Sequence, residues 1–485
     1  MFGFFPLILS AFLLGLGFYL LLQVLARKEP ANLLRGSMGW PLFGETLGFL
    51  KPHRSNSMGS FLQEHCSRYG RVFKSHLFGS PTIVSCDHEL NMVVLQNEEK
   101  LFQVSYPKAM HGILGKFSLL IVSGDVHKKL RNIGVSFITS SKSNPEFLDC
   151  VEKMTISMMN SWKNCKEIGF YKEVKKFTLN LMVKHLLSIE PEEPLAFKIL
   201  EDFLTYMKGF VSLPVYLPGT PYASAVKARA RLSATVMEII KERRKEKLGP
   251  VKGDFLDAIL SKENLSDEKT VSIVLDMLLA GYETTATLMA LIVYFLSLYP
   301  NVLEHLKQEH NAIRKNKENG EPLNWEDYQK MEFTCNVRKL FTNRCRCGNV
   351  VKFVHRVALQ DVKFKGYFIP SGWKILPVLT AVHFDPSLHE NPMVFNPWRW
   401  TSAIWMTQDK ATSKKVMPFG GGPRLCPGAD LAKVEIAFFL HHLVFNYRWK
   451  TMADDFPLAY PYVEFRRGLL LEIEPVQAKA GKIET

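Results

Sequence analysis

One cysteine in a glycine-rich loop is the residue of this chain best placed to do chemistry. The loop reads Phe419-Gly-Gly-Gly-Pro-Arg-Leu-Cys426-Pro-Gly428, and the residues after it, 429–444, are predicted to form a helix. Backbone N–H groups and a helix N-terminus favour negative charge, so Cys426 can be held as a thiolate. A thiolate can ligate haem iron and promote O–O cleavage, and flanking glycines let the backbone approach a large flat ligand. The loop therefore predicts a haem site for oxidative chemistry.

A second group of candidate residues interrupts a long apolar segment, in the sequence Ala280-Gly-Tyr-Glu-Thr-Thr285. An acid beside a hydroxyl in an apolar helix is a local inconsistency of the kind that often marks a functional site. Thr284 can hydrogen-bond a preceding carbonyl, and Glu283 and Thr284 together are candidates for a proton relay. Gly281 has no side chain, so the helix can lie against a flat ligand there. The alternative interpretation is a helix in which these residues only pack.

Basic residues that suit the acidic groups of a haem occur in two places. Arg424 lies two residues before Cys426. His127 and Arg131 are four residues apart, and on a helix they share one face. Taken singly, each of these residues is also explained as an ordinary surface base.

The two motifs resemble those of the cytochrome P-450 family. Five residues fit its haem-loop pattern F-x-x-G-x-R-x-C-x-G, namely Phe419, Gly422, Arg424, Cys426 and Gly428. The segment 280–285 is similar to its oxygen-binding motif, (A/G)-G-x-(D/E)-T-T. The resemblance covers essentially the whole chain. It implies haem b with Cys426 as axial thiolate, and electrons from NADPH through a flavoprotein reductase.

The resemblance also assigns further contacts to the haem propionates. Gly124 to Arg131 is similar to the family's W-x-x-x-R segment, with His127 at the tryptophan position. Arg356 lies where a family arginine reaches a propionate. The resemblance thus implies a cradle that contains His127, Arg131, Arg356 and Arg424.

The elements that must position these residues are mainly helices, with a minor sheet region. Ser266 is predicted to cap a helix that runs to Tyr299, and Asp276 and Glu283 within it argue against a membrane span. Residues 145–247 are mostly helical in pattern, interrupted by the proline-rich loop 213–221. Strands are predicted at 72–77, 82–85 and 463–473. The sequence predicts one large P-450-type haem domain over residues 45–485.

The N-terminal region is predicted to anchor this domain in a membrane. Residues 2–25 carry no charged side chain, and this length is enough to span a bilayer. A cleaved signal peptide is the alternative, but no basic region precedes the segment and no A-x-A-like site follows it. Arg27 and Lys28 would lie in the cytoplasm. We expect a single-pass anchor over 1–25, a linker over 26–44, and a cytosolic catalytic domain at the endoplasmic reticulum.

Composition limits the partners. The net charge of +14 permits docking of an acidic reductase, and no nucleic-acid-binding signature accompanies it. The eight cysteines have no framework or zinc spacing, which suits a reducing compartment. The expected partners are a reductase, a membrane and a hydrophobic small molecule, with no obligate oligomer.

One segment departs from the family pattern. The family carries an E-x-x-R pair on a helix, which a further arginine joins to lock the fold; here Arg346 stands at the arginine position and Asn343 at that of the glutamate. Either the segment 335–347 is a sequence or splice artefact, or the glutamate has been lost. Loss of one partner from a buried charge network costs about 3–5 kcal/mol, so the form as written would then bind haem poorly.

The substrate is expected to be hydrophobic, because the site lies at a buried haem and the chain is membrane-anchored. The segments 213–222 and 348–356 resemble a plant branch of the family that oxidises steroid and terpenoid hormones, most similarly the enzymes that hydroxylate C-22 of brassinosteroid precursors. Abscisic acid, gibberellin precursors and triterpenoids are alternative substrates. Two other functions remain open: an oxygen-independent haem-thiolate isomerase or dehydratase, and a non-catalytic relative without working haem.

Overall fold

The computed structural model describes residues 14–15, 17–19, 34–40, 44–245, 252–261, 265–318, 320–341, 350–389, 391, 394–400, 416–452, 454–460 and 462–476. The α-helices are α2 (Thr46–Phe49), α3 (Ser60–Tyr69), α4 (His88–Gln96), α5 (Lys108–Leu114), α6 (Gly124–Ser141), α7 (Pro145–Ser161), α8 (Phe170–Leu187), α9 (Pro194–Met207), α10 (Pro221–Lys245), α11 (Phe255–Leu260), α12 (Asp267–Leu298), α13 (Pro300–Lys315), α14 (Trp325–Lys330), α15 (Glu332–Lys339), α16 (Leu379–His383) and α18 (Ala429–Asn446). Short 3-10 helices are η1 (Lys208–Val211), η3 (Pro397–Trp400) and η5 (Gly422–Arg424).

The strands are β1 (His53–Arg54), β2 (Val72–Leu77), β3 (Ser80–Ser85), β4 (Phe102–Val104), β5 (Glu167–Gly169), β6 (Arg356–Ala358), β7 (Val362–Phe364), β8 (Tyr367–Ile369), β9 (Lys374–Pro377), β10 (Tyr447–Thr451), β11 (Pro457–Tyr460), β12 (Tyr462–Phe465) and β13 (Leu470–Pro475). They form a five-stranded sheet in the order β2-β3-β9-β6-β4 and three smaller sheets, β1-β11-β12, β10-β13-β5 and β7-β8. In the five-stranded sheet β3 and β9 run parallel, and the other neighbours are antiparallel. The predicted mainly helical fold with a minor sheet is confirmed.

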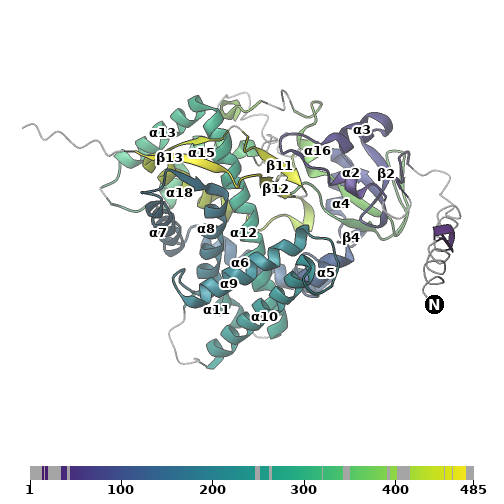
Figure 1. Ribbon diagram of the computed structural model, residues 1–485, viewed down its shortest axis with the longest axis horizontal. Coiled ribbons are helices and arrows are strands. Elements are labelled where there is room, and N and C mark those ends of the chain that lie inside the picture. The colour runs from purple at the N-terminus through teal and green to yellow at the C-terminus, as the bar shows by residue number, and fades with distance from the viewer. Residues whose placement is uncertain are drawn as a thin grey trace, which may run out of the picture.

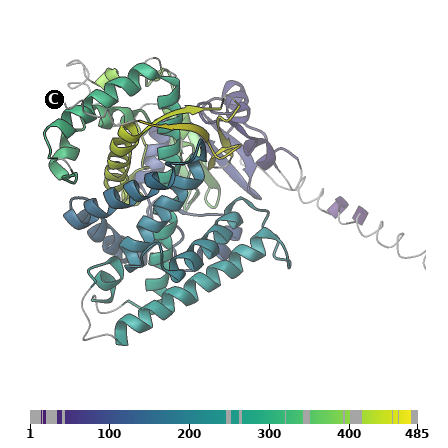
Figure 2. The ribbon, with the colours of Figure 1, turned by 60° about the vertical axis from the view of Figure 1, so that its left-hand side comes forward.

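The helices and the five-stranded sheet occupy different regions of the molecule. Figure 1 shows most of the helices on one side, around α12 and α18, and the sheet on the other side with α2, α3, α4 and α16. The turned view in Figure 2 shows the same division. One large apolar core joins the helices, and two smaller clusters pack around the sheet.

Helix α12 is the central helix of this core. It spans Asp267–Leu298, within one residue at each end of the prediction, and Ser266 has the extended backbone of a cap residue. The Ser266 side chain makes no capping hydrogen bond, so that part of the prediction is wrong. Asp267 and Glu268 in the first turn complement the helix dipole instead. In the described part of the chain α12 alone has the length and composition of a membrane span, and 67% of its apolar window is buried, as expected of a core helix.

The strand predictions differ from the structure at their ends. β2 covers the predicted range 72–77, but β3 begins at Ser80 because Ser80 and Pro81 pair with Leu77 and His76 across the turn. The single predicted strand at 463–473 is two strands, β12 and β13, which belong to different sheets. The predicted loop 213–221 contains no helix up to residue 220, but its last residue, Pro221, begins α10, because proline is favourable in a first turn.

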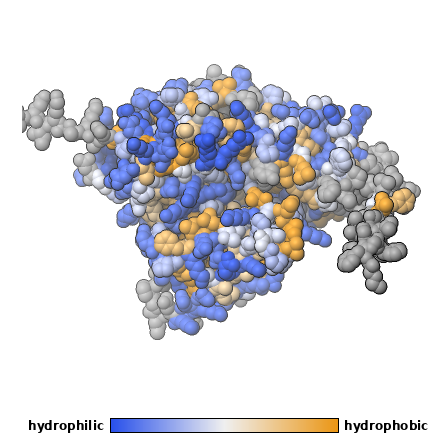
Figure 3. Space-filling model, in the orientation of Figure 1, coloured by the Kyte–Doolittle hydropathy of each residue, from blue (hydrophilic) through white to orange (hydrophobic). Residues whose placement is uncertain are grey.

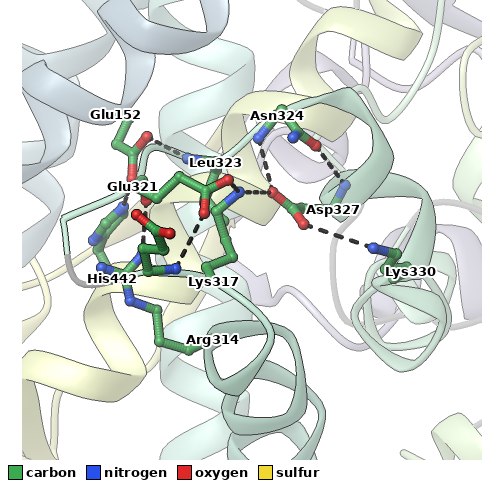
Figure 4. A network of polar contacts seen from close by, with 10 residues as sticks. Glu152, Arg314, Lys317, Glu321, Leu323, Asn324, Asp327, Lys330 and His442 are labelled. Atoms are coloured by element: carbon green, nitrogen blue, oxygen red, sulfur yellow. Dashed lines mark hydrogen bonds and ion pairs between the residues drawn. The ribbon is translucent and has the colours of Figure 1, made fainter.

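A polar network fixes the C-terminal helix of the core, α18, to its neighbours (Figure 4). Glu152 of α7 accepts from the backbone N–H of Leu323 at 2.7 Å and pairs with His442 of α18 at 2.9 Å. Lys317, whose side chain is 4% exposed, bridges Glu321 at 2.8 Å and Asp327 at 2.7 Å. The network therefore ties the segment between α13 and α14 to α7 and α18. The cysteine loop ends at Gly428, the N-cap of α18, so the position of this helix sets where the loop ends.

Three sequence predictions lie wholly or largely outside the described residues. The predicted anchor, residues 1–25, is described only at 14–15 and 17–19, which are helical. The linker 26–44 is described at 34–40 and 44, where Gly44 donates to the carbonyl of Trp40 at 2.8 Å. Asn343 and Arg346 are outside the described residues, so the segment 335–347 is described only up to residue 341.

Candidate haem site

The cysteine loop is a tight turn held against helix α4. The N–H of Cys426 donates to the carbonyl of Phe419 at 3.0 Å, which closes the loop on itself. Gly422 has a φ of 64°, and a Cβ at this position would lie 2.0 Å from the carbonyl oxygen of Leu95 at the end of α4. Any side chain at residue 422 would push the loop away from α4. The glycine in the motif is thus required by the close backbone contact as well as by its φ.

The surroundings of the Cys426 thiol have opposing effects on its pKa. Part of the Cys426 surface is exposed, yet enough protein surrounds the thiol that burial raises its pKa. The N–H groups of Gly428 and Ala429 and the charges of Arg131 and Lys433 lower that pKa. These groups direct hydrogen-bond donors and positive charge to the sulfur, while burial makes a lone thiolate costly. The loop therefore suits a thiolate that binds a metal cation.

Helix α6 brings Arg131 and His127 to the loop, as their spacing predicts. Arg131 donates through Nη2 to the carbonyl of Leu425, the residue before the cysteine. His127 is buried, and burial, assisted by the positive charges of Arg424 and Arg131, lowers its pKa to about 4. In this structure His127 is therefore neutral at physiological pH, and a neutral ring can donate a hydrogen bond to a haem propionate. Its contact with a propionate stays a prediction.

Arg356 and Arg424 converge on a residue that sequence reasoning did not identify, Glu98. Arg424 Nε donates to Glu98 Oε1 at 2.9 Å, and Arg356 Nε lies 2.8 Å from Glu98 Oε2. The second contact is an ion pair by distance but lacks hydrogen-bond alignment. The Glu98 side chain is only 2% exposed. No motif marks Glu98; the only sequence signal is an acid directly after the apolar helix α4.

The strands explain how Arg356 reaches this position. β6 lies between β9 and β4 in the five-stranded sheet, with Arg356 opposite Ile375 and Val104. The N–H of Val104 also donates to Glu98 Oε1, at 3.2 Å. Glu98 is therefore held by the sheet edge and by both arginines.

The middle of α12 carries the predicted acid and hydroxyl, and each has a defined partner. Thr284 Oγ1 donates to the carbonyl of Ala280 at 2.6 Å, which confirms the predicted bond to the preceding turn. Glu283 Oε1 accepts from Tyr171 Oη at 2.8 Å and pairs with Lys175 Nζ at 2.9 Å. Both partners come from helix α8, and neither was identified from sequence.

Tyr171 connects Glu283 to the rest of the core. Its hydroxyl lies 2.8 Å from Thr287 Oγ1 and 3.1 Å from the carbonyl of Val463. Burial raises the pKa of Tyr171 well above its usual value, and the neighbouring Glu283 raises it further, so the phenol stays protonated. The buried end of Glu283 is thus occupied by two donors from α8.

The structure explains the glycine at position 281 by a contact other than the predicted one. A Cβ at this position would lie 2.5 Å from Cγ of Met182 on α8, so the glycine lets α12 and α8 pack closely. A contact of Gly281 with a flat ligand remains a prediction.

Taken together, the donor set suits haem. A thiol with N–H donors directed at it, a glycine-shaped turn and three arginines beside the loop are what a planar ligand with iron and two carboxylates requires. In the described residues no cluster of three or more metal-ligating side chains offers another metal site.

Comparison with known proteins agrees with this reading. Residues 34–480 match the family model for cytochrome P-450. The chain is 57% identical to cytochrome P-450 724B1 of Oryza sativa subsp. japonica over 449 residues, which cover 91% of this chain and 92% of that protein. The chain belongs to the cytochrome P-450 family. It is a monooxygenase, and the cofactor of the family is haem with a cysteine thiolate ligand.

Two further relatives carry names that state an activity. The chain is 43% identical to a cholesterol 22-monohydroxylase of Paris polyphylla, with 97% of this chain and 99% of that protein covered. It is 42% identical to a steroid (22S)-hydroxylase of Oryza sativa subsp. japonica, with 93% and 90% covered. The solved structure of retinoic acid bound cyanobacterial CYP120A1 superposes with a TM-score of 0.78 over 93% of this chain and 100% of that chain, at 24% identity. That likeness supports the fold alone.

Proposed function

We propose that the protein hydroxylates C-22 in the side chain of a steroid, with a brassinosteroid precursor as the physiological substrate. The cysteine loop carries the reaction class, because its donors suit a thiolate-bound haem. The names of the relatives support the substrate, since two of the three reported above hydroxylate a steroid or cholesterol at C-22. Haem with a thiolate ligand, supplied with O2 and two electrons, provides the oxygen insertion.

In this proposal each residue near the loop has one task. Cys426 is the thiolate ligand, and the N–H groups of Gly428 and Ala429 stabilise its charge. Arg131, Arg356 and Arg424 balance the propionates, with neutral His127 as an additional donor. Phe419 and Gly422 shape the turn.

Glu283 and Thr284 are proposed to move protons from α8 to the reacting oxygen. Glu283 accepts a hydrogen bond from Tyr171 at 2.8 Å and pairs with the Lys175 ammonium at 2.9 Å, so its carboxylate is held in place by Tyr171 beside a cation. Thr284 is exposed and adjacent to Glu283 on α12. Its hydroxyl, now bonded to the carbonyl of Ala280, can rotate to donate toward the site. An oxygen-independent isomerase would have no use for this pair.

We further propose that the domain lies on the cytosolic face of the endoplasmic reticulum and receives electrons from an NADPH-dependent flavoprotein reductase. The anchor over 1–25 is supported by its uncharged sequence. The surface supports a membrane contact: Leu213 is 78% exposed, and Tyr216 and Leu217 are each 60% exposed. This loop lies near α5, since Tyr216 contacts Tyr222, whose hydroxyl donates to Ala109 at 2.8 Å. Figure 3 shows apolar patches in an otherwise largely hydrophilic surface, one of them in the area of α5.

The proposal is tested with the full chain in microsomes that contain a plant reductase. The reduced carbon monoxide spectrum is recorded first, and a strongly red-shifted Soret band is expected. NADPH and cholesterol are then added, and the position of the new hydroxyl group is determined by mass spectrometry. Cys426→Ser should abolish the band and the product, whereas Cys165→Ser, at an exposed cysteine outside the loop, should preserve both.

A steroid with the same rings but no side chain is the substrate control, and it should give no product. Hydroxylation of a steroid at another carbon would overturn the C-22 assignment. Turnover only of abscisic acid, a gibberellin precursor or a triterpenoid would overturn the steroid class.

A further inference from the structure

The loop between α5 and α6 is hydrogen-bonded to helix α12 on one side and to the cysteine loop on the other. We call residues 115–122 the strap; they contain turns but no regular helix or strand. The N–H of Leu119 donates to Asp276 Oδ2 of α12 at 2.6 Å. The carbonyl of the same residue accepts from Arg424 Nη1 at 2.8 Å. One peptide segment thus connects a carboxylate of α12 to an arginine two residues from Cys426.

Two hydrogen bonds hold the strap on each side. On the α12 side the Ser118 hydroxyl donates to Asp276 Oδ1 at 2.7 Å, so both carboxylate oxygens of Asp276 bind the strap. On the other side Arg424 Nη2 donates to the carbonyl of Val122 at 2.6 Å. The strap's own turn is closed by Ser118, whose carbonyl accepts from Ile121 and Val122, each at 2.9 Å. These bonds fix the position and the orientation of the strap.

Asp276 is an unusual residue at its position in the helix. It is 8% exposed in a stretch of α12 whose other side chains are almost all apolar, and burying a carboxylate is costly unless strong donors bind it. Both donors it has come from the strap. Arg229 of α10 contributes positive charge nearby, and Gly115 packs so closely on the Arg229 guanidinium that a Cβ there would lie 1.9 Å from it. The strap, α10 and α12 therefore meet at Asp276.

We propose that Asp276 is a positioning residue: it holds the strap in place between α12 and Arg424, and so sets where the strap's apolar side chains meet the substrate. Leu119 and Val122 are partly buried against the helical core, and Leu120 is partly exposed. A released strap would widen the site and allow the substrate more than one orientation. Arg424 would keep its bond to Glu98, so the haem should stay bound.

The first measurement is amide hydrogen exchange of the haem-loaded protein at Leu119, because that N–H is itself the bond in question. Asp276→Ala removes both acceptor atoms, and exchange at Leu119 should become at least about tenfold faster, because the amide loses the hydrogen bond that protects it from exchange. Asp276→Asn keeps one oxygen acceptor and should lie between the wild type and Asp276→Ala. The matched control is Asp267→Asn on the same helix, which weakens two contacts with Arg244, at 3.0 and 2.5 Å, and removes a charge from the first turn of α12 but should match the wild type at Leu119.

The second measurement is the product pattern with cholesterol, which relies on the proposed function. Asp276→Ala should retain the carbon monoxide band, raise KM more than it lowers kcat, and yield hydroxylation at several side-chain carbons. Equal exchange at Leu119 in all four proteins would overturn the inference. Faster exchange with an unchanged product pattern and KM would overturn the positioning role.

The two measurements separate the two proposals. If the wild type does not hydroxylate any steroid, the proposed substrate fails, and the exchange data still decide whether Asp276 holds the strap. If Asp276→Ala does not fold with haem, hydrogen exchange in Asp276→Asn and Ser118→Ala decides whether Asp276 holds the strap. Each of these variants leaves one hydrogen bond between residue 276 and the strap.

Discussion

Glu98 accepts a hydrogen bond from Arg424 at 2.9 Å while its second oxygen faces Arg356 at 2.8 Å. Two arginines that the family resemblance assigns to haem propionates thus already share a protein carboxylate. The charge of Glu98 keeps the two guanidinium groups close to one another and to the cysteine loop.

Glu98→Gln is expected to destabilise the protein and weaken haem retention. The change leaves buried Arg356 and partly buried Arg424 with no carboxylate between them, and breaking a buried pair costs about 3–5 kcal/mol. Urea unfolding and the rate of haem transfer to apomyoglobin measure the two effects. The matched control is Glu89→Gln, at an exposed pair with Lys365, whose loss should leave stability and haem retention almost unchanged because solvent screens the pair. Equal effects of the two changes would contradict the role given to Glu98.

Thr284→Ala is expected to lower the rate of product formation by about 100-fold, the lower end of what a positioned proton donor contributes. Thr284→Ser keeps the hydroxyl and should retain most of the activity. The measurement is the rate of product formation, with the product formed per NADPH consumed recorded beside it. A relay role is excluded if the serine and alanine variants perform alike.

Tyr171→Phe is expected to affect both the proton relay and the folding stability, and its control variant affects the stability alone. The hydroxyl binds Glu283, Thr287 and the carbonyl of Val463, so its loss should change the pH dependence of turnover and cost about 1–3 kcal/mol of stability. Tyr447→Phe provides the control, because its buried hydroxyl makes a single bond, to the carbonyl of Met159 at 2.7 Å. That variant should lose stability and keep the wild-type pH profile. A shifted profile in both variants would mean that stability alone explains the effect.

Asp276 gives the folding stability a defined pH dependence. Burial raises the pKa of Asp276 from its usual range to about 7, against the hydrogen bonds from Leu119 and Ser118, which lower it. The folded protein therefore holds a proton that the unfolded chain releases, so this contribution is fully present below about pH 4 and is lost as the pH rises through 7. Asp276→Asn removes the titration, and the free energy of unfolding of the wild type, relative to this variant, should fall between pH 5 and pH 8. A difference that does not change with pH would contradict the assignment.

Asn343 leads to a prediction from sequence alone, since residues 343 and 346 lie outside the described part of the chain. If the glutamate has been lost, Asn343→Glu should increase the haem content of the purified protein. If 335–347 is an artefact of the sequence, the transcript will encode a different segment there. Equal haem content with and without the substitution, together with a transcript that matches the sequence, would contradict both explanations.

The sequence predicted those features that depend on neighbours along the chain. The ends of α12 follow from Ser266, Pro300 and an unbroken apolar run, and the cysteine loop follows from its own glycines. The bond from Thr284 to Ala280 is likewise local. Features that depend on tertiary contact were missed: Glu98, Tyr171 and Lys175 have no local signature, and Gly281 acquires its purpose from Met182 on another helix. The neutral state of His127 follows from burial, which spacing does not reveal.

The haem cradle also has a consequence for the order in which the chain folds. Arg424 and Glu98 are 326 positions apart, and Arg131 and the carbonyl of Leu425 are 294 positions apart. Contacts between such distant residues close very long loops and form late, because the entropy of the intervening chain must be lost first. During synthesis Glu98 and Arg356 can pair first, but the cradle is complete only after Arg424 and the cysteine loop have left the ribosome. Haem capture therefore reports that the chain has been made and folded at least as far as Cys426, and a transcript that stops before this residue would yield a protein that takes up no haem.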